Sequence, residues 1–229
     1  MAGTLTLDDY RERVYQFAYG SRDDEEILFW LNMSIKELAR RWRWSWLEKT
    51  ASFATVASQA YTAFPADFQY WGRLRRASGD SGTYAVPEFV SELDPRYDHP
   101  SKWYNVAQGE PKWYTLWAEQ CNWYPTPDAV YTYTLDYWFK PTEFTSTPTS
   151  TCTVPDEFSD VLVHMVLLKS ATREDDLAKQ QTLASIVETH IQQMMRDEKT
   201  RQRQNRRSAA MPDHYYGQYD SDIARWRRR

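Results

Sequence analysis

The sequence predicts an α+β protein: a helical bundle formed by the N- and C-terminal helices, with a β-rich domain inserted between them. Apolar residues repeat with helical spacing before residue 43 and again after residue 155. Between these segments, apolar and polar residues alternate with the period of two that is typical of strands. The last part of the chain has many arginines and no apolar period, which predicts an extended C-terminal tail. The predicted parts are a helical bundle domain of residues 1–43 and 156–200, a β-rich domain of 44–141, a linker of 142–155 and an Arg/Tyr/Trp-rich tail of 201–229.

The N-terminal segment predicts two helices. Thr6 to Asp9 resemble a capping box, and Tyr10, Val14 and Phe17 follow at helical spacing. A second helix is predicted over residues 22–42, with acidic residues in its first turn, where the helix dipole favours them. Its apolar stripe consists of Ile27, Leu31, Ile35, Leu38 and Trp42.

The middle of the chain predicts strands separated by turns. Residues 129–139 (AVYTYTLDYWF) give the clearest pattern, with Tyr131, Tyr133, Leu135, Tyr137 and Phe139 on one face. Residues 112–118 and 121–125 predict a hairpin that turns at Glu119-Gln120, and residues 49–56 and 63–77 also have strand composition. Residues 78–110 are expected to form loops with short strand pieces.

The C-terminal third predicts a helical hairpin of about 157–172 and 175–200, interrupted by the charged residues 173–176. Neither pair of helices can bury its apolar stripe alone. We therefore expect the N-terminal pair to pack on the C-terminal pair as a four-helix unit.

The tail is basic whereas the rest of the chain is acidic. Residues 201–229 contain eight Arg and three Asp, a formal charge of +5, so that the first 200 residues carry −9 of the total of −4. Such asymmetry suggests that the tail meets an acidic partner. Trp and Arg often dominate interface energies, and a tryptophan in a solvated tail needs a pocket on a partner. The predicted partner-binding residues are Arg206, Arg207, Tyr215, Tyr216, Tyr219, Trp226, Arg227, Arg228 and Arg229.

The sequence offers little support for catalysis. It has no nucleotide-binding, metalloprotease or nucleophile-elbow motif, and Gly-Asp-Ser-Gly at 79–82 is read as a turn. The four histidines are scattered, although His164 and His190 could face each other across the helical hairpin. Only Cys121 and Cys152 are present, without metal-ligand spacing. We therefore expect no enzymatic activity, no cofactor and no metal, and we expect neither a signal peptide nor a membrane span.

Aromatic residues make up 16% of the chain, which leaves alternatives to a purely structural role. One is a DNA-binding protein that uses the basic tail together with Arg73, Arg75 and Arg76 beside Tyr70 and Trp71. The other is a carbohydrate-binding module that uses aromatic residues of the β-rich domain.

Residues 39–53 (ARRWRWSWLEKTASF) mark the change from helical to strand period. Trp42 continues the helical stripe and is expected in the helical core. Trp44 and Trp46 come where the chain enters the β-rich domain. Large rings can hold two parts of a protein together by packing against both. We therefore interpret Trp42, Trp44 and Trp46 as an architectural helix-to-β joint.

Four stretches resemble tailed-phage head-to-tail adaptors, also called connector or tail tubular A proteins. They are 31–68, which includes the joint, 109–116 (GEPKWYTL), 124–141 (YPTPDAVYTYTLDYWFKP) and 154–171 (VPDEFSDVLVHMVLLKSA). The resemblance implies a structural virion protein that forms a ring of about twelve subunits. The ring would dock beneath the portal protein, extend the DNA channel and hold the tail nozzle or another distal tail protein. Genomic DNA would pass through without specific binding, and the C-terminal tail would reach along the portal.

Overall fold

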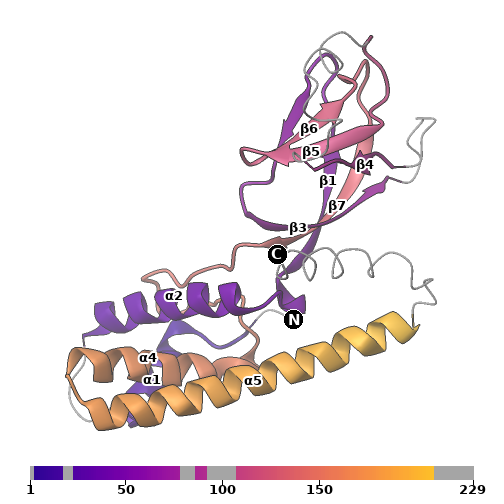
Figure 1. Cartoon of the computed structure of the whole chain (residues 1–229). Coiled ribbons are helices and arrows are strands. Elements are labelled where there is room, and N and C mark those ends of the chain that lie inside the picture. Colours follow the sequence, from indigo (N-terminus) through magenta and orange to yellow (C-terminus); the bar gives the residue numbers. More distant parts are fainter. Residues whose placement is uncertain (1–2, 18–22, 78–85, 92–106, 209–229) are drawn as a thin grey trace.

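The computed structural model describes residues 3–17, 23–77, 86–91 and 107–208, and the side chains up to residue 201. Helices and two sheets form an α+β fold, in which the N-terminal and C-terminal helices flank a β region, as the sequence predicts. The helices lie together in one part and the strands project from it as a second part (Figure 1). We call these the helical part and the β part.

The described helices are α1 (Leu7–Phe17), α2 (Asp24–Arg41), α4 (Ser159–Arg173) and α5 (Leu177–Ser208), with the short 3₁₀ turns η1 (Ser45–Leu47) and η2 (Asp156–Phe158). The predicted capping box at α1 is present: the Asp9 carboxylate accepts the Thr6 N–H at 2.7 Å, and the Asp9 N–H donates to the Thr6 hydroxyl at 3.3 Å. The predicted second helix matches α2 to within two residues at either end. The predicted last helix is longer than expected, because α5 runs on past residue 200 to Ser208.

Helix α4 lies at the centre of the helical part. It packs against α1, α2 and α5, and Leu162 and Val166 have no exposed surface. Ile27, Leu31, Ile35 and Leu38 of α2 are likewise fully buried, which confirms the predicted stripe up to Leu38. Phe17, by contrast, is 61% exposed at the end of α1.

Residues 142–155, predicted as a linker, run along the helices and contribute to their core. Phe144 and Val154 are buried, and the Asn32 side-chain amide exchanges hydrogen bonds with the Phe144 backbone at 2.9 and 3.0 Å. Thr151 also forms a bridge with Thr6. The segment owes its order to the helices on which it packs.

The β part contains two sheets. One has the order β1-β7-β3 and is antiparallel, with β1 (Glu48–Ala54), β7 (Thr132–Phe139) and β3 (Phe68–Arg76). The other has the order β2-β6-β5-β4, with β2 (Tyr61–Ala63), β6 (Gln120–Tyr124), β5 (Trp113–Trp117) and β4 (Glu88–Phe89). The short β4 runs parallel to β5, whereas the other pairs are antiparallel.

Two strand predictions are confirmed in detail. In β7, Tyr133, Leu135 and Tyr137 are buried and the residues between them are not, as the alternation predicts. Strands β5 and β6 form the predicted hairpin. Its turn residues are Ala118 and Glu119, with φ of 51° and 59°, one position earlier than predicted.

Aromatic side chains fill the space between the two sheets. Trp123 of β6 stacks on Tyr133 of β7 with ring centres 5.3 Å apart, and Phe53 of β1 lies 5.9 Å from the Trp123 ring. This core is separate from the helical one. Large rings therefore allow a thin double sheet to bury enough apolar surface to be stable.

Both cysteines are free and buried, Cys121 in the β part and Cys152 against the helices. Among the helices that the structure describes, none is both long enough and apolar enough to span a bilayer.

Asp156 ties the start of the chain to the entrance of α4. Its carboxylate accepts the N–H groups of Thr4 and Leu5 at 2.8 and 3.0 Å, and also the Thr4 hydroxyl. The Thr4 hydroxyl bond and the bonds from the Leu5 and Thr4 N–H groups lower the pKa of Asp156 below its ordinary value. The lowered pKa means that the native state prefers the ionised carboxylate.

Asp156 should thus stabilise the fold at neutral pH and lose this contribution as the pH falls below about 4. We expect Asp156→Asn to be less stable than the native chain at pH 7, with a difference that shrinks toward pH 3. Urea unfolding at a series of pH values measures this. Asp197→Asn, at an exposed carboxylate of α5, is the control. A difference in stability between Asp156→Asn and the native chain that stays constant with pH would contradict the assignment.

Candidate functional site

The segment between α2 and β1 joins the helical part to the β part. Trp42 leaves the helix with extended backbone, φ −156° and ψ 162°. Trp44 is fully buried in the helical core, and its indole N–H donates to the Leu38 carbonyl at 2.7 Å. The expectation that Trp42 lies in the core is only partly right: α2 ends at Arg41, so Trp42 is half-buried at the edge and Trp44 occupies the interior.

Helix α5, which is far away in sequence, contacts this joint through two side chains. The carboxylate of Glu198, only 2% exposed, accepts the Ser45 N–H at 3.0 Å and the Ser45 hydroxyl at 3.1 Å. The neighbouring Lys199 places its ammonium 4.9 Å from the centre of the Trp42 ring. The C-terminal half of α5 therefore holds the turn from which β1 departs.

The joint also reaches the sheet. Trp46 stacks on Trp44 at 6.2 Å between ring centres, with 20° between the planes. The Arg43 guanidinium lies 5.3 Å from the ring centre of Trp138 in β7 and 5.9 Å from that of Tyr70 in β3. One short segment thus contacts helices and strands through large rings and a cation.

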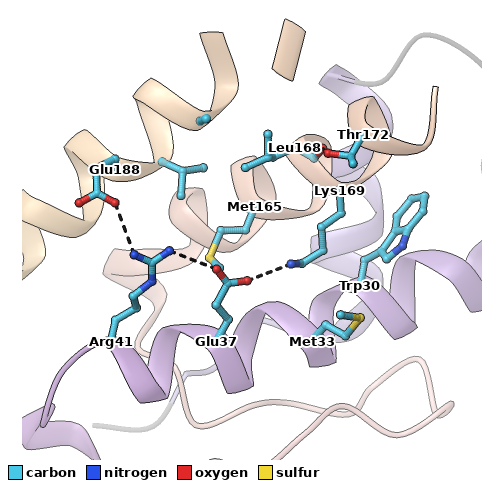
Figure 2. A pocket seen from close by; sticks show the side chains of 11 residues that line it. Trp30, Met33, Glu37, Arg41, Met165, Leu168, Lys169, Thr172 and Glu188 are labelled. Carbon is cyan, nitrogen blue, oxygen red and sulfur yellow. Dashed lines mark hydrogen bonds and ion pairs between the residues drawn. The ribbon is translucent and has the colours of Figure 1, made fainter. Parts of the chain in front are cut away.

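A second feature of the helical part is a groove of ≈ 640 Å³ between α2 and α5, with α4 as its floor. Figure 2 shows its side chains converging from the three helices. The apolar lining comes from Trp30, Met33, Met165, Leu168, Ala184 and Val187.

Charged residues along the groove are paired with one another. Glu37 accepts Lys169 at 3.0 Å and Arg41 at 3.3 Å, and Arg41 also lies 3.7 Å from Glu188 (Figure 2). Burial of Glu37 opposes its ionisation, but the bonds and charges of Lys169 and Arg41 outweigh burial and lower the pKa of Glu37. The groove therefore combines an apolar floor with a fixed set of charges, an arrangement suited to binding a protein surface.

The histidines and the Gly-Asp-Ser-Gly sequence noted in the sequence are only partly covered by the described residues. His164 and His190 do face each other, with ring centres 5.3 Å apart, edge to face. Among the described residues, no group of three or more His, Cys, Asp or Glu side chains could hold a metal ion. His99, His214 and the Gly-Asp-Ser-Gly sequence at 79–82 lie outside the described residues.

The arginines suggested for DNA binding form ion pairs with carboxylates of the β part. Arg75 donates two hydrogen bonds to Asp136, at 2.9 and 2.6 Å, and Arg76 pairs with Glu110 at 2.9 Å. Trp71 turns inward, 5.5 Å from the Tyr114 ring. Arg73 lies 3.5 Å from the same Asp136. Two carboxylates therefore offset two of the three positive charges, which leaves little attraction for a polyanion.

The predicted partner-binding residues of the tail are not tested by the structure. Arg206 and Arg207 fall within α5, but their side chains lie outside the description. Tyr215, Tyr216, Tyr219 and residues 226–229 follow the last described residue.

Comparison with protein families gives a match to the SU10 adaptor protein family over residues 5–213, which include both the helical part and the β part. The chain belongs to the SU10 adaptor protein family. This confirms the resemblance to phage head-to-tail adaptors. Membership makes the chain a structural phage adaptor, found in the virion, that interacts with other head or tail components. The comparison with curated proteins finds no match.

In this adaptor, Trp44 should matter chiefly for stability. We expect Trp44→Ala to lower the free energy of unfolding by about 3–5 kcal/mol, because it leaves a cavity and removes a buried hydrogen bond. Trp117→Ala, at a tryptophan that is 56% exposed, should change it by no more than about 0.5 kcal/mol. Thermal unfolding followed by circular dichroism measures both changes. Equal losses of stability in the two variants would contradict the assignment of Trp44 to the helical core.

Glu198 should stabilise the joint through its hydrogen bonds with Ser45. Glu198→Ala leaves the Ser45 N–H and hydroxyl without their acceptor, at an expected cost of about 1–3 kcal/mol. Glu188→Ala, ten residues earlier on the same helix with a side chain 52% exposed, is the matched control and should cost less. Denaturant unfolding gives the energies. Hydrogen exchange should show faster exchange confined to residues 42–50 in Glu198→Ala; unchanged exchange there would contradict the role.

Proposed function

We propose that this adaptor forms a ring, of about twelve subunits, that docks beneath the portal protein. There it extends the DNA channel and provides the attachment platform for the tail nozzle or another distal tail protein. In this role it needs no catalysis, cofactor or metal. The observation that carries the proposal is the family match over residues 5–213, which extends from the first helix beyond α5.

The presence of two distinct parts supports a separate role for each of them. We assign the helical domain (1–43 and 156–200) to packing within the ring, and the β-rich domain (44–141) to the next tail component. Residues 142–155 connect the two. Trp42, Trp44 and Trp46 act as the architectural joint: Lys199 of α5 lies over Trp42, and Arg43, between the tryptophans, contacts Tyr70 of β3 and Trp138 of β7.

The C-terminal tail is the proposed portal-binding segment. Its +5 charge contrasts with the acidic body, and Trp226 with its neighbouring arginines is suited to a pocket on another protein. Because α5 continues to Ser208, the tail begins as helix, with Arg206 and Arg207 in its last turn.

A mixture of the adaptor with the portal protein of the same virion tests the proposal. We expect rings stacked on portals by negative-stain electron microscopy, and DNA binding that is weak at physiological salt. Absence of rings, together with tight DNA binding that weakens steeply with salt, would favour the DNA-binding alternative. Tryptophan fluorescence shifts with glycans would favour the carbohydrate-binding alternative.

Truncation after Ser208 separates folding from docking. The truncated chain should keep the melting temperature of the full chain, because the removed residues show no core periodicity, and should lose binding to the portal. A variant with Trp226 and Arg227 to Arg229 changed to Ala keeps the chain length and should lose most of that binding. Portal binding by both variants equal to that of the full chain would refute the role of the residues after Ser208.

A further inference from the structure

We infer that neighbouring copies of this adaptor meet head to tail, with the exposed ridge of α1 on one copy seated in the groove between α2 and α5 of the next. The inference rests on the proposed ring and names the two surfaces that build it.

The ridge consists of Asp8, Glu12 and Tyr15. These residues are spaced at i, i+4 and i+7, so they lie along one side of α1, and all three are exposed. The buried residues Leu7, Tyr10 and Val14 occupy a different side. The Tyr15 hydroxyl donates to Asp24 at 2.5 Å, which fixes the ring in place.

The cations beside the ridge point away from its crest. The side chain of Arg11 is only 14% exposed and lies against Asp8 and Asp24. Arg13 lies against α4, where it donates to Ser159 at 2.6 Å and pairs with Asp160. Asp8 keeps 57% of its side chain exposed although Arg11 offsets its charge, so the acidic character of the ridge comes mainly from Glu12.

The ridge and the groove lie on opposite sides of the helical part. Helix α4 meets α1 through Ser159, Asp160 and His164, whereas Met165, Leu168, Lys169 and Thr172 form the groove floor. At 100° per residue these two sets lie roughly 150° apart around α4. Figure 1 agrees, with α4 between α2 and α5 and α1 behind it.

A contact between ridge and groove joins two different surfaces, so it is heterologous: the ridge of one copy meets the groove of the next. Because the two surfaces lie on opposite sides, each copy can contact two neighbours at once. Repetition of such a contact closes into a ring when the rotation between copies allows it.

The charges of the two surfaces complement each other. Within the groove lining, Arg41 and Lys169 are balanced by Glu37 and Glu188, so the lining has a formal charge of zero. Arg41 keeps 47% of its side chain exposed, and Arg40, the preceding residue of α2, is also exposed. The C-terminal end of α2 would therefore present positive charge to Glu12 of the neighbouring copy. Opposite charges on the two faces favour the head-to-tail arrangement and disfavour ridge against ridge.

The two surfaces can also make apolar contacts with each other. Met33 is 44% exposed on the groove wall, and Phe29, one helical turn earlier, is 61% exposed. Trp30 lies between them in sequence and lines the groove. The Tyr15 ring of the neighbouring copy would cover this apolar surface, which water otherwise contacts.

Disulfide trapping tests the contact. The double variant Glu12→Cys with Met33→Cys, incubated with the portal protein under mild oxidation, should give a ladder of covalent oligomers on denaturing gels. The native Cys121 and Cys152 are buried and should not contribute. Either single variant should stay monomeric, because each surface alone lacks its partner cysteine. Glu12→Cys with Ser52→Cys, at an exposed position of β1, is the matched control and should give no ladder.

Charge reversal provides a measurement without cysteines. Glu12→Arg should reduce the yield of rings on portals at least several-fold, whereas Glu119→Arg, an exposed carboxylate of the β5–β6 turn, should leave it unchanged. Circular dichroism checks that both variants fold.

Three outcomes would overturn the inference. Rings on portals without a ladder from the double variant would reject these surfaces while leaving the proposed function intact. A covalent dimer from Met33→Cys alone would replace the head-to-tail contact with a two-fold one. Absence of rings for the native chain with its portal would reject the proposed function itself, and the contact with it.

Discussion

The hydrogen bonds from Ser45 to the buried Glu198 fix how the two parts of this adaptor are joined. A side chain with 2% exposure needs hydrogen-bond donors for its oxygens, because a buried polar group without a partner is costly. Glu198 lies in α5, and Ser45 lies in the turn that leads from α2 into β1. The direction of β1 therefore depends on the position in which α5 packs within the helical part. The directions of β7 and β3, which pair with β1 in one sheet, depend on it as well.

Two separate cores make this joint necessary. The helical core is mostly aliphatic, whereas the β core is built of stacked and edge-on rings such as Trp123 on Tyr133. The buried residues of the two cores form separate clusters, and Phe139 of β7 packs against both. Parts that only the chain connected would move independently. The rings at residues 42–46 and the Arg43 contacts to Tyr70 and Trp138 bridge that gap.

Local patterns in the sequence predicted much of this fold, and long-range pairings decided the rest. The stripe Ile27, Leu31, Ile35 and Leu38 predicted α2, and the alternation in 129–139 predicted β7, because burial on one side imposes those periods. Spacing could not show that Trp44 would replace Trp42 in the core, since that depends on where α2 ends. Nor could it reveal Glu198 with Ser45, 153 positions apart in sequence, or the groove, which requires three helices to be placed together.

Continuity of α5 links the proposed portal contact to the β part. The same helix lines the groove at Val187, accepts the Ser45 hydrogen bonds at Glu198 and continues to Ser208, within the proposed portal-binding tail. Because one helix carries all three features, a shift of α5 on docking of the tail would also move the acceptor of Ser45, from which the chain enters β1.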